Sequence, residues 1–300
     1  MTEERKQEIL EIIRNTNRRP AQTGKPLYSE EIMAYPNLCE EIESISRTVD
    51  GFSYRMDILR AKNRGENCPL FINIHGGGFI GPHRENDTYF SAYMADQIHG
   101  ITVDLDYTLS DAAPYPVALH QCMDALDYVA EHANTWGASA KDISVGGYSA
   151  GGALTAAMGI CCAERGGFVP KLQILCYPPL EYRIPDQYKI DAYDRQIGME
   201  RCKAFADLYF DDKKENFEDI HNSPLYAPRE ILAKQPKTLI LSAGLCNFRY
   251  EDEDYAICLA DAGAEVILKR FPEASHGFIP HFMDGWKEAA DLMVREILEK

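Results

Sequence analysis

The chain has 300 residues, of which 45% are hydrophobic and 26% are charged, and its formal net charge is −16. This composition is ordinary for a soluble globular protein, and the length fits one large α/β domain. The acidity argues against nucleic acid and anionic membranes as partners, because both require clustered positive charge.

The N-terminus and the cysteines indicate a compartment. Residues 1–19 are charged throughout and lack the apolar core of a signal peptide, and no stretch approaches the ~20 apolar residues of a membrane span. The nine cysteines are scattered without a C-x-x-C pair, which favours reduced thiols over a disulfide framework or a zinc site. We therefore expect a cytoplasmic protein that binds no metal and no membrane.

The apolar pattern predicts alternating helices and strands. Apolar residues recur at helical spacing in residues 3–15, which predicts an amphipathic helix, and a strand pair is expected at 41–49 and 53–59. The alternation that follows predicts a mostly parallel sheet covered by helices on both faces. Further strands are predicted at 70–74, 101–105, 143–145, 172–177, 238–241 and 265–271, and further helices at 116–132, 153–162, 251–262 and 286–299.

Residues 182–233 interrupt this alternation with charged and aromatic residues and no strand pattern. The segment follows a strand, on the side where ligands bind in such sheets. We expect it to form a cap, together with residues 1–40, over a catalytic domain of residues 50–300; the alternative is a surface insertion with no role in the site. Its aromatic residues either line a pocket or, as is more common at helical spacing, belong to the core: Tyr188, Tyr193, Phe205, Tyr209 and Phe210.

A glycine motif surrounds Ser149. Residues 147–151 read Gly-Tyr-Ser-Ala-Gly and fit the pattern G-x-S-x-G. This pattern makes a tight turn from a strand into a helix, with the serine hydroxyl held at the edge of the sheet. The motif follows a predicted strand and precedes a helix of small residues, which is the context it needs. We predict that Ser149 is a nucleophile; the alternative is a structural turn rich in glycine.

A second glycine motif, His75-Gly76-Gly77-Gly78, ends an earlier predicted strand. Because glycine has no side chain, backbone N–H groups at these positions can approach a substrate oxygen closely. The position relative to the serine motif is that of an oxyanion hole, and the alternative is a plain glycine loop. His75 leads this loop, so we expect it to form structural hydrogen bonds rather than to act as a base.

His276 follows the last predicted strand, in the sequence Ser275-His276-Gly277-Phe278. In one family of serine hydrolases the triad serine comes first along the chain and the triad histidine last. The other histidines have no such placement, and each is expected on the surface or in packing. We therefore predict that His276 is the base that activates Ser149.

Five motifs occur in one order along the chain: HGGGF at 75–79, DYTLSDAAPYP at 106–116, GYSAGG at 147–152, SPL at 223–225 and HGF at 276–278. Over roughly residues 50–295 the chain resembles the hormone-sensitive-lipase-like group of α/β-hydrolases. The resemblance implies an α/β-hydrolase fold, with a mostly parallel eight-stranded sheet flanked by helices and a helical cap. It also implies hydrolysis of short acyl esters without a cofactor.

The resemblance assigns roles to five residues. Ser149 corresponds to the nucleophile and His276 to the base. Gly77, Gly78 and Ala150 correspond to the residues whose backbone amides bind the oxyanion.

The chain departs from this group at the third member of the triad. The group carries an aspartate in a motif like A-x-x-D-P-L-R-D-E, and residues 243–251 read Ala-Gly-Leu-Cys-Asn-Phe-Arg-Tyr-Glu, which places Cys246 at the acid. A neutral thiol accepts hydrogen bonds weakly, and loss of the acid in other triad enzymes costs on the order of 10⁴ in turnover. A thiolate beside an imidazolium is one alternative. A second alternative is that no group replaces the acid. The remaining alternatives are four other residues that could hold the histidine: Asn247, Asp252, Glu251 and Glu181.

These residues predict a serine carboxylesterase that hydrolyses small or short-acyl esters through an acyl-enzyme. The alternative hypothesis is a weakened or retired hydrolase that binds a small molecule, because Cys246 replaces the acid. We expect a small-molecule ester as the partner, with no cofactor and no nucleic acid. The sequence determines neither the particular ester nor the oligomeric state, and a homodimer is one state that we consider.

Overall fold

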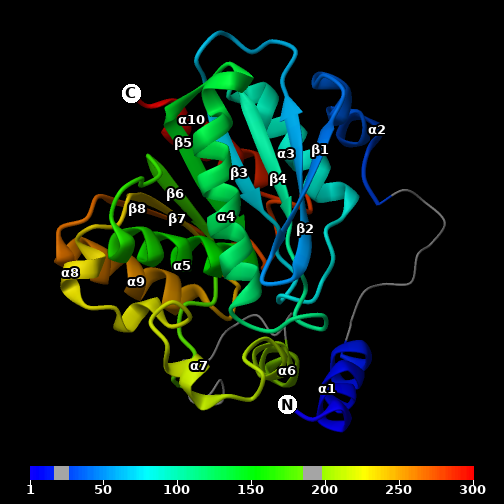
Figure 1. The fold of residues 1–300 in the computed structure, drawn as a ribbon, viewed down its shortest axis with the longest axis vertical. Helices are drawn as coiled ribbons and strands as arrows, with labels where there is room; N and C mark the ends of the chain where they lie inside the picture. The colour runs from blue at the N-terminus through cyan, green and yellow to red at the C-terminus, as the bar shows by residue number, and fades with distance from the viewer. Residues whose placement is uncertain (17–26, 185–197) are drawn as a thin grey trace.

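The centre of the molecule is an eight-stranded sheet (Figure 1). The computed structural model describes residues 1–16, 27–184 and 198–300. The strands lie in the order β1-β2-β4-β3-β5-β6-β7-β8, and β2 pairs antiparallel with β1 and β4 while the other pairs are parallel. The predicted eight-stranded, mostly parallel sheet is therefore confirmed. The strands are β1 (Glu43–Val49), β2 (Phe52–Arg60), β3 (Cys68–Ile74), β4 (Ile101–Asp106), β5 (Ala138–Tyr148), β6 (Leu172–Cys176), β7 (Lys237–Ala243) and β8 (Val266–Phe271).

Helices cover both faces of the sheet (Figure 1). On one face, α4 (Val117–His132), α5 (Ala150–Arg165) and α9 (Arg249–Ala262) bury their apolar sides, and on the other face α3 (Glu85–Gln97) and α10 (Trp286–Leu298) do so. The central strands are buried on both faces, which explains why they appear in the sequence as short, continuous apolar runs. The remaining elements are α1 (Glu3–Asn15), α2 (Glu30–Met33), η1 (Tyr35–Leu38), η2 (Ala133–Trp136), α6 (Met199–Tyr209), α7 (Lys214–Glu218), η4 (Pro224–Tyr226) and α8 (Arg229–Leu232).

Two predictions of local structure were incomplete. Helix α3 was missed, because polar Asn86, Asp87 and Ser91 are buried on it beside Phe90 and the apolar pattern has no single stripe. Strand β5 begins at Ala138, five residues before the predicted run from Ile143. The first part of β5 is polar and partly exposed, so no apolar run marks it.

Helices α1 and α6 form a separate small layer outside the sheet. Ile9 and Ile13 of α1 pack against Ala204 and Leu208 of α6, and Figure 1 shows the two helices side by side at the bottom of the view. The short helix η1, which lies between α1 and α6 in the sequence, is not part of this layer. Cys39 at its end packs with residues of β2 and α3. Within the described ranges, no helix combines the length and the apolarity that a membrane crossing needs.

The parallel arrangement brings the loops after six strands to one edge of the sheet. Strands β3 to β8 run in the same direction, so their carboxyl ends meet there. The glycine loop 75–78 follows β3, Ser149 follows β5, and Cys246 and His276 follow β7 and β8. Ligands bind at this edge in sheets of this type.

Candidate active site

Ser149 lies in the sharp turn between β5 and α5. Its backbone has φ 53° and ψ −119°, a strained conformation for a residue with a side chain. The turn is held by the Ser149 amide, which donates to the Cys176 carbonyl at 2.9 Å. Gly151 is required because a Cβ there would lie 2.1 Å from the Ile74 carbonyl oxygen. The glycine motif thus lets α5 begin directly against the end of β3, with the serine hydroxyl at the sheet edge.

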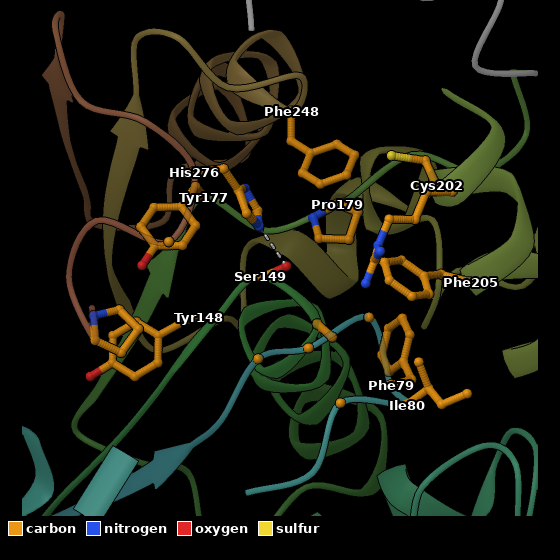
Figure 2. A pocket seen from close by; sticks show the side chains of 18 of the residues that line it. Phe79, Ile80, Tyr148, Ser149, Tyr177, Pro179, Cys202, Phe205, Phe248 and His276 are labelled. Atoms are coloured by element: carbon orange, nitrogen blue, oxygen red, sulfur yellow. Dashed lines mark hydrogen bonds between the residues drawn. The ribbon is translucent and has the colours of Figure 1, made fainter. Parts of the chain in front are cut away.

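His276 reaches Ser149 from the loop after β8. Its Nε2 lies 2.9 Å from Ser149 Oγ, the dashed contact in Figure 2. The rings of Tyr177 and Phe248 pack edge-on to the imidazole, with centroids at 5.0 and 5.6 Å. Burial lowers the pKa of His276 to about 3, and the nearby His281 adds to this effect. The imidazole is therefore neutral at pH 7, as a general base requires.

Cys246 occupies the position beside His276 where the acid was expected. The loop after β7 is joined to the loop after β8, since the amides of Gly244 and Leu245 donate to the carbonyls of Phe271 and Ala274 at 2.8 and 3.1 Å. As a result, Cys246 Sγ lies 3.0 Å from His276 Nδ1. The loop therefore presents Cys246 itself to His276, as the alignment of the motif indicated, rather than its neighbour Asn247.

The four alternative partners from the sequence form no hydrogen bond with the imidazole in the described part of the chain. In the part of the chain that the structure describes, His276 has two hydrogen-bond partners, Ser149 and Cys246. Asp252 is fully buried in α9, and burial together with Glu251 raises the pKa of this carboxyl well above its usual range. Glu251 instead accepts from the amides of Leu180 and Glu181, and Glu181 accepts from the Ile184 amide. Asn247 follows Cys246 in the same loop without reaching His276.

Three residues proposed for the oxyanion hole line the same cavity as Ser149. Gly77 and Gly78 have φ values of 122° and 64°, which favour glycine, and they line the same cavity as Ser149 and Ala150. Among the described residues, the amides of Gly77, Gly78 and Ala150 donate to no protein atom. The Ala150 amide is at the first turn of α5, where helical N–H groups have no intrahelical partner and favour negative charge. The arrangement is chemically suited to bind an oxyanion.

A buried polar network supports the glycine loop. His75 Nδ1 lies 2.7 Å from the Gly76 carbonyl, and the ring stacks on Tyr107. Burial lowers the pKa of His75 to about 4. Next to it, His83 Nε2 lies 2.7 Å from buried Asp104, whose other oxygen accepts from Asn73. Although burial disfavours the charged ring of His83, Asp104 raises its pKa to about 9.

The site opens into a cavity of about 370 Å³, within the usual range for small ligands. Figure 2 shows Phe205, Phe79 and Phe248 around the space beside Ser149. Of the aromatic residues expected in the cap, Phe205 lines the cavity, Tyr209 and Phe210 are core residues, and Tyr188 and Tyr193 lie outside the described residues.

The sequence reasoning missed several residues of the cavity wall. Most of them come from segments that no motif marks and that only the tertiary structure brings to the site. Arg84 is the exception, because it follows the glycine loop closely along the chain. The missed residues are Ile13, Arg84, Tyr177, Arg201 and Phe248. Nowhere in the three described ranges do three or more His, Cys, Asp or Glu side chains group as metal ligands would.

Comparison with known proteins identifies the family. Residues 71–280 match the family model described as the alpha/beta hydrolase fold. The chain belongs to this family. Part of it is also similar to hormone-sensitive lipase of Bos taurus, with 29% identity over 120 residues that cover 40% of this chain and 16% of the lipase. The resemblance inferred from the motifs is thereby confirmed.

Proteins named as esterases are among the relatives. Esterase LipI of Mycobacterium tuberculosis is 30% identical over 217 residues, which cover 71% of this chain and 66% of LipI. A solved structure from a study of two esterases of Rhizomucor miehei superposes with a TM-score of 0.79 at 26% identity, over 96% of this chain and 95% of that chain. The match spans 61% to 66% of the length of LipI and two further curated relatives.

Proposed function

We propose that this chain is a serine carboxylesterase that acts on small or short-acyl esters, with Ser149 as the nucleophile. The observation that carries the proposal is the 2.9 Å contact between Ser149 Oγ and a neutral His276, beside three unpaired amides. The names of LipI and of the Rhizomucor miehei esterases support the same reaction class.

The mechanism follows from these positions. His276 accepts the Ser149 proton as Oγ attacks the ester carbonyl, and the amides of Gly77, Gly78 and Ala150 stabilise the oxyanion. His276 then protonates the leaving alcohol, which releases it and leaves an acyl-enzyme on Ser149. Water, activated by His276, hydrolyses the acyl-enzyme and restores the serine. The reaction needs no cofactor.

We also propose that α1 and α6 act as the cap over this site. Ile13 of α1 and Phe205 of α6 line the cavity, and the Phe205 ring lies so close to Gly78 that a Cβ there would be 2.4 Å from it. The cap proposed here is smaller than the cap of residues 1–40 and 182–233 that the sequence predicts. Cys39 packs with Leu59 of β2, and α8 packs with α9, so both belong to the hydrolase domain.

The test compares the wild-type protein with Ser149→Ala on p-nitrophenyl acetate and butyrate. We expect the wild type to hydrolyse both esters and the variant to lose at least 10³-fold in kcat, on the order of the loss seen for other triad serines. A fluorophosphonate probe should label the wild type at Ser149 and leave the variant unlabelled. Equal rates for the two proteins, together with an inert Ser149, would contradict the proposal and favour a small-molecule binding protein.

Cellular location and assembly are further proposals. The free cysteines support a cytoplasmic location, which subcellular fractionation tests. Whether the chain forms a homodimer is checked by sedimentation equilibrium of the purified protein.

A further inference from the structure

Arg84 differs from the other half-buried arginines of the molecule. It lines the cavity of Ser149 at the start of α3. Arg47, Arg60 and Arg64 are each hydrogen bonded to a carboxylate. Within the described residues, the guanidinium of Arg84 has neither an ion pair nor a hydrogen bond. A half-buried charge is costly to leave unpaired, which makes an external partner the simplest account of it.

The carboxyl group of Asp87, which also lines the cavity, does not neutralise Arg84. Asp87 Oδ2 accepts a hydrogen bond from the Arg84 backbone amide at 2.9 Å, rather than from its side chain. Asp87 is buried, and this burial, with Asp104 adding to it, raises the pKa of its carboxyl to about 8. The group is therefore mainly protonated at pH 7. It is the one carboxyl among the described residues of the cavity wall.

A second guanidinium, from helix α6, also belongs to the cavity wall. Arg201 of α6 lines the wall, donates to the Ile13 carbonyl at 3.2 Å and lies 5.0 Å from the centroid of the Phe205 ring. The cavity wall thus carries positive charge in a chain whose net charge is −16. The net negative charge of the chain repels anions, whereas the positive charge of the cavity wall favours them at this site.

We propose that Arg84 is a specificity-determining residue that selects esters carrying a second, anionic group, namely a carboxylate. The inference rests on the proposed esterase function and narrows its substrate class. Arginine suits this task because its planar guanidinium binds a carboxylate through two parallel hydrogen bonds. The cavity also has apolar walls, which include Phe205 and Ile80 and which limit the water that competes for such a pair.

The experiment compares charged and neutral esters of matched size. Monoethyl esters of dicarboxylic acids from succinate to suberate place the carboxylate on the acyl side, and each is paired with the ethyl ester of the monocarboxylic acid of equal carbon number. Acetate esters of ω-hydroxy acids, paired with acetates of the corresponding alcohols, place it on the alcohol side. Hydrolysis is followed by pH-stat titration, and the readout is the ratio of kcat/KM, charged over neutral.

We expect the wild type to prefer at least one charged ester, and Arg84→Gln to lower that ratio by roughly 10- to 100-fold, the range of one charge-assisted hydrogen-bonded pair. Arg84→Lys should keep part of the preference. Arg64→Gln is the matched control, because Arg64 is also half-buried but pairs with Glu40 far from the site, and the ratio should not change.

Two results would overturn the inference: no charged ester is preferred in either series, or Arg84→Gln lowers both members of a pair equally. Failure of the esterase proposal looks different. In that case neither neutral nor charged esters are hydrolysed, and the fluorophosphonate leaves Ser149 unlabelled.

Discussion

Cys246 fixes the tautomer of the His276 ring less strictly than an aspartate would. The 3.0 Å bond between Sγ and Nδ1 can run in two directions. If Nδ1–H donates to sulfur, Nε2 is free to accept the Ser149 proton. If the thiol donates to Nδ1, Nε2 keeps its hydrogen and cannot act as a base. The Phe248 amide, which donates to Sγ at 3.4 Å, favours sulfur as an acceptor and so the first arrangement.

Replacing Cys246 by aspartate should therefore increase activity. A carboxylate only accepts hydrogen bonds, so it enforces the reactive tautomer and stabilises the imidazolium that forms during attack. We expect Cys246→Asp to raise kcat for p-nitrophenyl butyrate by at least 10-fold, out of the roughly 10⁴-fold that a triad acid contributes elsewhere. Cys246→Ser is the control, because it is neutral and of similar size, and should give no such gain. An unchanged rate in Cys246→Asp would show that the tautomer is already set.

The same pair of proteins should differ in pH dependence. The base must be neutral, and because the pKa of His276 is lowered to about 3, wild-type kcat/KM should persist well below pH 6.5. An ionised aspartate raises the pKa of His276, so the acidic limb of Cys246→Asp should move to higher pH. The profile is measured from pH 4 to 8, with tryptophan fluorescence to confirm folding. Coincident acidic limbs would contradict this explanation.

At the scale of elements, the loop after β3 depends on a pair that lies beneath it. His83 and Asp104 are 8% and 0% exposed in their side chains, and they join this loop to β4. The loop carries the proposed oxyanion amides, so the pair that stabilises the loop also helps to hold these amides in place. His120 and Asp50 form a similar pair that is 50% and 44% exposed.

Removal of His83 should destabilise the protein. His83→Ala leaves the Asp104 carboxylate buried without its cation, which costs about 3–5 kcal/mol and lowers Tm by roughly 5–10 °C in a chain of this size. The pKa of His83 is raised to about 9, above its unfolded value near 6.5, so its contribution is complete below pH 6.5 and is lost as pH rises through 9. Calorimetry should show the Tm difference shrinking over that interval. His120→Ala is the control and should change Tm little; equal shifts for the two variants would refute the prediction.

At the scale of the whole molecule, the N-terminus completes a site built mainly from the sheet edge. Helix α1 reaches the cavity through Ile13, and it is held to α6 by a small apolar contact that includes fully buried Ile9. This contact is separate from the core clusters of the sheet. The layer of α1 and α6 can therefore be disturbed while the sheet stays folded.

Ile9→Asp tests the contribution of this layer. A carboxylate at this buried position should separate α1 from α6, and we expect kcat/KM to fall several-fold, mainly through KM, while the main unfolding transition in calorimetry moves little. Gln7→Asp is the control, because it adds the same charge on the exposed side of α1. If Ile9→Asp leaves KM unchanged, α1 has no part in binding.

The local patterns of the sequence predicted most of the sheet and the central residues of the site. Buried strands appear as apolar runs, and the turns at Ser149 and Gly77-Gly78 need glycine at fixed positions, so both leave a local pattern. Helix α3 left no such pattern, because its buried residues are partly polar.

Contacts between distant segments were decided by the tertiary structure alone. That Cys246 itself, rather than Asn247 or Asp252, meets His276 depends on hydrogen bonds between the loops after β7 and β8. The wall of the cavity, with Ile13, Arg201 and Phe248, joins segments that no sequence spacing relates. The sequence by itself determined the fold class and the sharp turn that holds Ser149, because those depend on local backbone requirements. The partner of the base and the charge of the cavity depend on packing across the molecule.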